Sequence, residues 1–292
     1  MQGIDITTPR GHFHVRDSTG DGTPVVMLHG WPESSYCWTH VAAHLDPRWR
    51  VIAPDLLGLG DSGRCAELER YRKQSLAADI LAVLDAMQID DFLLVGHDWG
   101  GVVAQEMAIA APARVRALVL MNIALINNLR GNLEVIENQR NSSSFAIWYQ
   151  HFQQTELPGK LIPGNERHWL GYFLQSWGGE FPADSFEEYV RMYSIPGTPE
   201  TGANYYRSMN DDITRWAGLA GHVYPMPGLY IYGKQDPVIT PDYLNHHEDC
   251  FEQIEVVEIE AGHFLQEEQP QQVADHLNRF FKQTLANYSA FA

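Results

Sequence analysis

The residues best suited to chemistry are Gly96-His97-Asp98-Trp99-Gly100-Gly101, directly after the apolar run Phe92-Leu93-Leu94-Val95. This order is the strand, sharp turn and helix pattern G-x-S-x-G, with aspartate in the place of serine. A serine there forms acyl-enzymes from esters, whereas a carboxylate attacks an sp³ carbon that bears a leaving group and forms an alkyl ester of the protein. The segment therefore predicts the opening of an epoxide or the displacement of a halide.

Asp98 has a second interpretation, as the N-cap of the helix that follows. Aspartate is common at that position because its oxygen accepts the free backbone N–H groups of the first turn. The glycines favour the nucleophile, since Gly96 and Gly100 let strand and helix approach closely around a strained central residue. A simple cap does not need both.

Two further polar residues follow apolar runs later in the chain. Asp236 lies in Gly233-Lys234-Gln235-Asp236-Pro237, and His263 lies in Ala261-Gly262-His263-Phe264. Each alone is typical of an ordinary turn or loop. The order Asp98, Asp236, His263 is the nucleophile, acid and histidine order of a hydrolase triad on a parallel sheet.

The segment His29-Gly30-Trp31-Pro32 follows the apolar run Pro24–Leu28. A loop after such an early strand supplies one oxyanion donor in this architecture, and the residue after the nucleophile supplies the other. We therefore predict that the backbone N–H groups of Trp31 and Trp99 form the oxyanion hole. A plain turn is the alternative, and a cis bond before Pro32 is one way to aim the Trp31 amide.

Strand and helix patterns alternate on both sides of a middle block. The expected strands are 4–7, 12–17, 24–28, 50–53, 92–95, 117–121, 228–232 and 254–259, with helices at 76–87, 99–110 and from about 273. Residues 125–220 read instead as helices rich in aromatics, among them Phe145, Trp148, Tyr149, Phe152, Trp169, Tyr172, Phe173 and Trp177.

Continuous apolar strands that alternate with helices predict an α/β fold with a mostly parallel sheet covered on both faces. We expect residues 1–124 and 221–292 to form this core. Residues 125–220 form a helical lid, or cap, inserted after the sixth strand over the edge where such folds bind ligands.

The amino-acid composition excludes several classes of binding partner. The 292 residues carry a net charge of −17, which argues against nucleic acid and anionic membranes. Cys37, Cys65 and Cys250 fit neither a metal site nor a disulfide framework. No basic and apolar leader is present, so we expect a cytoplasmic protein, although a signal peptide removed earlier would leave no trace. No apolar run is long enough to span a membrane.

On these motifs the chain resembles the α/β-hydrolase-fold epoxide hydrolases over essentially its full length. His29-Gly30-Trp31-Pro32 matches their H-G-x-P motif, the segment 96–101 matches their elbow, and 53–62 is similar to their loop after the fourth strand. The resemblance implies two cap tyrosines that hydrogen-bond the epoxide oxygen. By motif position these are Tyr149 and Tyr206, with Tyr205 as the competing choice for the second.

The resemblance also implies a mechanism without metal or organic cofactor. Asp98 attacks the ring, His263 activates the water that cleaves the resulting ester, Asp236 orients the imidazole, and a vicinal diol leaves. The expected substrate is a small apolar epoxide, and the expected assembly is a monomer or homodimer.

Three other functions compete with this one. A haloalkane dehalogenase uses the same Asp–His–Asp triad, and the indole of Trp99 suits a halide, but Trp31 stands where many such enzymes have asparagine. A fluoroacetate dehalogenase places arginine after the nucleophile, where this chain has Trp99. A non-catalytic receptor on the same fold has no need for base, acid and oxyanion donors together.

Overall fold

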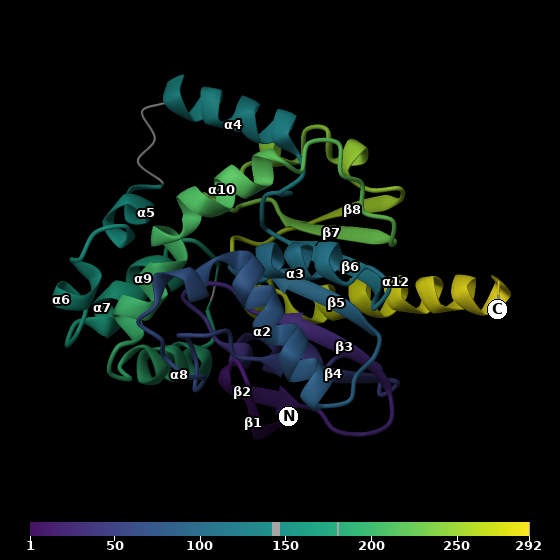
Figure 1. Cartoon of the computed structure of the whole chain (residues 1–292), viewed down its shortest axis with the longest axis horizontal. Helices are drawn as coiled ribbons and strands as arrows, with labels where there is room; N and C mark the ends of the chain where they lie inside the picture. The colour runs from purple at the N-terminus through teal and green to yellow at the C-terminus, as the bar shows by residue number, and fades with distance from the viewer. Residues whose placement is uncertain (142–146, 180, 292) are drawn as a thin grey trace.

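The computed structural model describes residues 1–141, 147–179 and 181–291 (Figure 1). Eight strands form one sheet in the order β1-β2-β4-β3-β5-β6-β7-β8. Their bounds are Gln2–Thr8, Gly11–Asp17, Thr23–Leu28, Trp49–Pro54, Phe92–His97, Val115–Met121, Gly228–Gly233 and Ile254–Ile259 for β1 to β8. The hairpin β1–β2 and the pair β2–β4 are antiparallel, and all other pairs are parallel.

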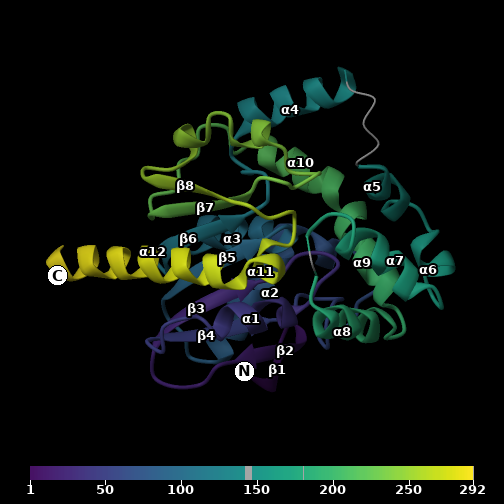
Figure 2. The same cartoon turned by 180° about the vertical axis from the view of Figure 1, so that it is seen from behind.

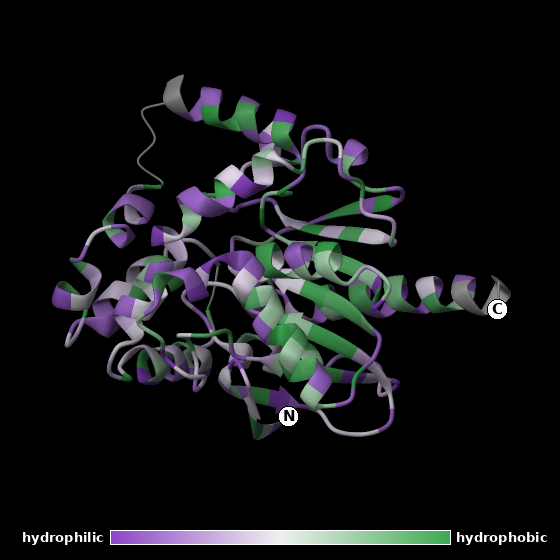
Figure 3. Cartoon of the chain, viewed as in Figure 1, coloured by the Kyte–Doolittle hydropathy of each residue, from purple (hydrophilic) through white to green (hydrophobic). Residues whose placement is uncertain are grey.

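Helices cover both faces of this sheet. The helices α2 (Lys73–Ala86) and α3 (Trp99–Ala110) lie on one face, and α1 (Thr39–Ala42), α11 (Leu265–Glu268) and α12 (Pro270–Phe291) lie on the other (Figures 1 and 2). The central strands β3 and β5 carry the continuous apolar runs Val25–Leu28 and Phe92–Val95 (Figure 3). Burial on both faces explains why they read as continuous apolar runs rather than as alternating ones.

Seven helices follow β6 and precede β7 in the described part of the chain. They are α4 (Leu129–Asn141), α5 (Trp148–Gln153), α6 (Pro158–Leu161), α7 (Glu166–Leu174), α8 (Ala183–Tyr193), α9 (Thr198–Arg207) and α10 (Met209–Ala217). They gather at one end of the sheet (Figures 1 and 2). Phe145, one of the aromatics expected in this block, lies outside the described residues.

The elements agree closely with the sequence pattern, and the α/β class with a mostly parallel sheet is confirmed. Strand β5 extends past Val95, because Gly96 and His97 still pair with β6 at Leu120 and Met121. Short 3₁₀ helices, which the pattern did not predict, occupy Ser35–Trp38 (η1), Leu68–Tyr71 (η2), Pro241–Leu244 (η3) and His247–Cys250 (η4). None of the described helices combines the length and the apolar character that a membrane crossing requires.

Candidate active site

Asp98 sits at the turn between the end of β5 and the start of α3. Its backbone has φ 48° and ψ −128°, a conformation that non-glycine residues rarely adopt, and its side chain makes no capping bond to α3. A Cβ on Gly100 would clash with the carbonyl oxygens of Leu28 and His29, and one on Gly96 would clash with Gly100. The turn is thus a tight elbow that points the carboxylate away from the helix.

Backbone donors hold this carboxylate. The Trp31 N–H donates to Asp98 Oδ1 at 2.8 Å, and the backbone N–H of Trp99 lies close enough to the carboxylate to help lower the pKa of Asp98. The Trp31–Pro32 peptide bond is cis. The two N–H groups expected at an oxyanion hole therefore converge on one side chain.

His263 lies between two carboxylates. Its Nδ1 is 2.7 Å from Asp236 Oδ2, and its Nε2 is 3.7 Å from Asp98 Oδ2. The other oxygen of Asp236 accepts the N–H groups of Val238 and Ile239 at 2.7 and 3.0 Å. Asp236 is fixed by its own loop and in turn fixes the imidazole, with Nδ1–H donating to it.

The charges of this group reinforce one another. Burial lowers the pKa of His263, but the charges and hydrogen bonds of Asp236 and Asp98 raise it to about 10. Burial raises the pKa of Asp98, but His263 and the Trp99 N–H bring it below its ordinary value. At neutral pH the resting site therefore holds an imidazolium between two carboxylates.

Tyr149 and Tyr206 come from α5 and α9 and face the same cavity as Asp98. Their ring centroids are 5.6 Å apart, and Tyr149 also stacks on Trp31 at 5.6 Å. Burial, together with the Asp98 charge, raises the pKa of Tyr149 far above its ordinary value, and burial does the same for Tyr206. Both phenols therefore stay neutral and keep their protons.

Tyr205 has a different place. Its hydroxyl donates to the Leu57 carbonyl at 2.8 Å, and it does not line the cavity. Of Tyr205 and Tyr206, which are adjacent in the sequence, it is therefore Tyr206 that the fold brings to the cavity of Asp98.

Gln150 donates its side-chain N–H to the Tyr149 oxygen at 3.3 Å, which leaves the Tyr149 proton free to point elsewhere.

The sequence motifs predicted no role for several buried polar residues that surround His263. His97 Nε2 bonds the His263 carbonyl at 2.8 Å, and its Nδ1 lies 3.1 Å from Glu33 Oε2. Gln266 donates to both oxygens of Glu33, and Asn122 donates to the His263 carbonyl at 3.2 Å. His97 stands inside the segment 96–101 and Glu33 directly follows His29-Gly30-Trp31-Pro32, which was the available signal. Gln266 and Asn122 gave none.

Lys73 is a buried cation below the elbow. Its Nζ lies 4.1 Å from the ring centroid of Trp99, 2.9 Å from Asp212 Oδ2 and 3.0 Å from Ser208 Oγ, and it also bonds the Tyr205 carbonyl. Burial lowers the pKa of Lys73 to about 8, although Asp212 acts to raise it. The ammonium connects α2 to the α9–α10 corner that carries Tyr206.

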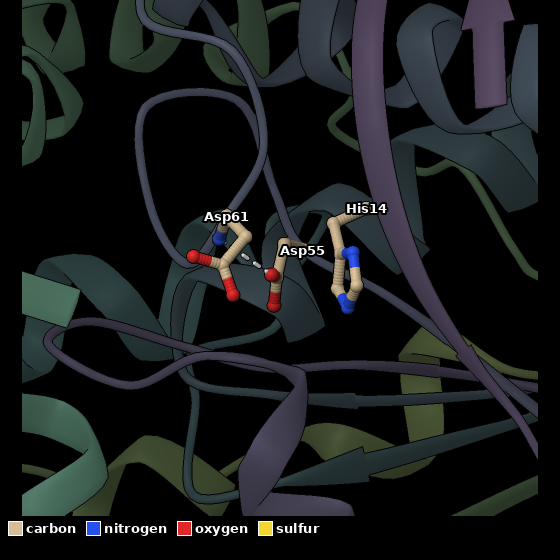
Figure 4. A group of neighbouring side chains, drawn as sticks. All are labelled: His14, Asp55 and Asp61. Carbon is tan, nitrogen blue, oxygen red and sulfur yellow. Dashed lines mark hydrogen bonds between the residues drawn. The ribbon is translucent and has the colours of Figure 1, made fainter. Parts of the chain in front are cut away.

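A separate cluster joins His14 on β2 to Asp55 and Asp61 in the loop after β4 (Figure 4). Asp55 Oδ1 accepts the Ser35 N–H at 2.7 Å, and its Oδ2 accepts the Asp61 N–H at 2.8 Å. The Asp61 carboxylate is paired with Arg191. These bonds occupy the acidic oxygens, so the cluster fixes the loop rather than contributing to the cavity.

Known proteins share this architecture. Residues 23–270 match the alpha/beta hydrolase fold family. Epoxide hydrolase 4 of Mus musculus is 28% identical over 294 residues, 93% of this chain and 76% of that protein. The soluble epoxide hydrolase of Corynebacterium sp. (strain C12) is 28% identical over 272 residues, 90% of this chain and 92% of that protein.

A solved structure of another protein has the same fold as this chain. The epoxide hydrolase CorEH without ligand superposes with a TM-score of 0.82 at 28% identity, covering 97% of this chain and 99% of its own. The family match spans most of the chain and includes both the elbow and the histidine loop. This chain therefore belongs to the α/β-hydrolase fold family.

Proposed function

We propose that this protein is an epoxide hydrolase that converts a small apolar epoxide to a vicinal diol through an alkyl ester on Asp98. The observation that carries the proposal is the pairing of the Asp98 carboxylate, held by the Trp31 N–H, with the two neutral phenols Tyr149 and Tyr206 on one cavity. The names of the relatives support the same activity.

The first step opens the ring. Asp98 Oδ1 is held by the Trp31 N–H and becomes the carbonyl oxygen, so Oδ2 is the attacking atom. As the Oδ2–carbon bond forms, the carbon–oxygen bond of the ring breaks and the leaving alkoxide takes a proton from the tyrosine pair. Phenols suit this task because they donate without carrying charge.

The second step cleaves the ester. A water molecule gives a proton to neutral His263 and attacks the Asp98 carbonyl carbon, and the tetrahedral oxyanion forms on Oδ1 between the Trp31 and Trp99 N–H groups. One such donor is typically worth about 3–4 kcal/mol. The acyl–oxygen bond breaks, and the diol leaves with the proton that His263 took from the water. Asp98 keeps the oxygen of the water and gives the remaining proton to His263, which restores the resting carboxylate and imidazolium.

Charge couples the two steps. His263 is protonated in the resting site because two carboxylates face it. Ester formation removes the negative charge of Asp98, which lowers the pKa of His263 and releases its proton to the tyrosinate. The imidazole thus becomes a base only once there is an ester to hydrolyse.

A haloalkane dehalogenase is the second candidate, and one observation favours it. The indole N–H of Trp99 makes no full hydrogen bond in the described part of the chain, although Tyr206 lies beside it. A halide needs a second donor, however, and the Trp31 indole N–H is committed to the Tyr193 hydroxyl at 2.9 Å. An epoxide oxygen would have two phenol donors, Tyr149 and Tyr206, whereas a halide would have only the indole N–H of Trp99.

The variant His263→Gln tests the proposal. It should be alkylated by an epoxide but should not turn over, because no base activates the water. Intact-protein mass spectrometry should show a stoichiometric gain of one substrate mass, located on the peptide that contains Asp98.

Asp98→Asn is the matched control and should gain no mass. Full turnover by His263→Gln would remove that residue from the mechanism. Halide release without diol formation on a small panel of substrates would replace the epoxide by a haloalkane. Unchanged turnover in Asp98→Asn would overturn the whole proposal.

A further inference from the structure

The Asp98 cavity extends well beyond the catalytic residues. It has a volume of about 270 Å³ and is lined from Asp98 to residues of α4 and α10. These two helices approach each other at one end (Figures 1 and 2). At about 30 Å³ for each group of water or methylene size, this volume holds roughly nine such groups. An epoxide ring and its nearest carbons fill only part of it.

Both helices present the same apolar spacing to the cavity. Leu129, Leu133 and Ile136 recur at i, i+4 and i+7 on α4, and Met209, Ile213 and Trp216 recur at the same spacing on α10. Residues at this spacing share one face of a helix. The cavity therefore runs between two apolar helix faces.

The outer part of these faces is open to solvent. Leu133 is 56% exposed, Ile213 is 50% exposed and Ile136 is 44% exposed. Single exposed apolar residues are normal on a protein surface, but three that line one cavity mark a binding surface. Leu133, Ile136 and Ile213 form what we call the mouth of the cavity. An alkyl chain of a substrate that reached these residues would cover their exposed surface.

The charges around the cavity determine whether a substrate arm that lies in it can be charged. None of the described residues that line the cavity is Lys, Arg or His, and Asp98 is its only acid. The Asn132 side-chain N–H is committed to the Leu125 carbonyl. A charged group in this space would have no counter-ion, and the net charge of −17 adds a repulsive field against anions.

We infer that the substrate is an epoxide with one uncharged alkyl arm of about six or more carbons, which lies between α4 and α10 and ends at the mouth formed by Leu133, Ile136 and Ile213. The inference rests on the proposed epoxide hydrolysis and adds the class of substrate and the residues that select it.

A series of terminal epoxides tests the inference. We expect kcat/KM to rise from 1,2-epoxybutane to 1,2-epoxyoctane by up to about fourfold per buried methylene, measured below the solubility limit of each compound. 5,6-Epoxyhexanoate, whose carboxylate would lie inside the cavity, should fall at least tenfold below 1,2-epoxyhexane, which has the same length. A series that is turned over with no dependence on length, or equal use of the acid, overturns the inference.

Variants locate the arm. Leu133→Gln and Ile213→Gln should each lower the epoxyoctane to epoxybutane ratio of kcat/KM by about threefold to tenfold. Leu161→Gln is the matched control, because Leu161 on α6 is 55% exposed and does not line the cavity, and it should keep the wild-type ratio. If the control lowers the ratio as much, the arm does not lie at the mouth.

The two proposals fail in different ways. If no epoxide of any length is hydrolysed or trapped on Asp98, epoxide hydrolysis itself is wrong. If short epoxides are hydrolysed and the length series is flat, only the alkyl arm is wrong.

Discussion

Asp98 stores strain that its neighbours sustain. A non-glycine residue with positive φ costs on the order of 1–3 kcal/mol, and such residues persist only where the surroundings fix them. Here β5, the start of α3 and the Trp31 N–H fix Asp98 from three sides. Its carboxylate therefore does not need to reorganise before it attacks.

At the same scale, the tyrosine pair gives a test with an adjacent control. We expect Tyr149→Phe and Tyr206→Phe each to lower the rate of Asp98 alkylation by about 100-fold, since a positioned acid contributes about that much or more. Tyr205→Phe loses the bond to the Leu57 carbonyl, which should cost about 1 kcal/mol of unfolding free energy, but should alkylate within twofold of wild type. Single-turnover quench experiments and urea unfolding measure the two effects.

The proton of His263 provides a second test among individual residues. We expect a pKa of about 10 for His263 in the wild type and a lower pKa in Asp98→Asn. The asparagine side chain, like the alkyl ester on Asp98, has no negative charge. NMR titration of the ring protons measures both. Equal values in the two proteins would mean that Asp98 does not control the base.

The same pKa has a consequence for stability. Because the folded pKa lies above the ordinary value of 6.5, protonation of His263 stabilises the fold fully below pH 6.5, and this contribution is lost as the pH rises toward 10. The unfolding free energy of wild type relative to His263→Gln should therefore fall across this window in urea titrations.

Among the elements, β3 and α3 approach each other closely, because Gly100 leaves no room for a side chain. We expect Gly100→Ala to lower the unfolding free energy by about 2 kcal/mol or more, because its Cβ would meet the carbonyls of Leu28 and His29. Activity should fall with it, since the elbow must open.

Gly171 on α7 is the matched glycine. A Cβ there would meet side-chain atoms only at 3.6 Å or more, and Gly171 lies inside a helix. Gly171→Ala should raise the unfolding free energy by about 0.5–1 kcal/mol. Similar losses in both variants would mean that the elbow is not specially tight. Thermal unfolding monitored by circular dichroism compares the two.

In the whole molecule, Lys73 couples α2, which packs on the sheet, to the α9–α10 corner that carries Tyr206. It comes from α2, while Asp212 and the Tyr205 carbonyl come from the insertion between β6 and β7. Lys73→Met leaves the Asp212 carboxylate buried without its cation and should cost about 3–5 kcal/mol. The double variant Lys73→Met/Asp212→Leu should recover most of that loss, as a urea double-mutant cycle would show. An additive cycle would mean that the pair is not coupled.

Sequence alone determined the elements that bear local signals. Buried parallel strands read as continuous apolar runs, glycines marked the elbow, and Asp98, Asp236 and His263 each stood where a strand ends. The ends of parallel strands meet at one edge of a sheet, so their order along the chain already implied that they are neighbours.

Only the tertiary structure decided what depends on how distant segments pack. The choice between Tyr205 and Tyr206 is a rotation of about 100° around one helix, which the sequence does not register. Three features join residues that are far apart in the chain. Gln266 and Asn122 support His263 and its neighbours, the Lys73 ammonium lies near the ring of Trp99, and the apolar faces of α4 and α10 line one cavity. Contacts of this kind leave no periodicity in the sequence, because each partner by itself resembles an ordinary polar or apolar residue of a helix.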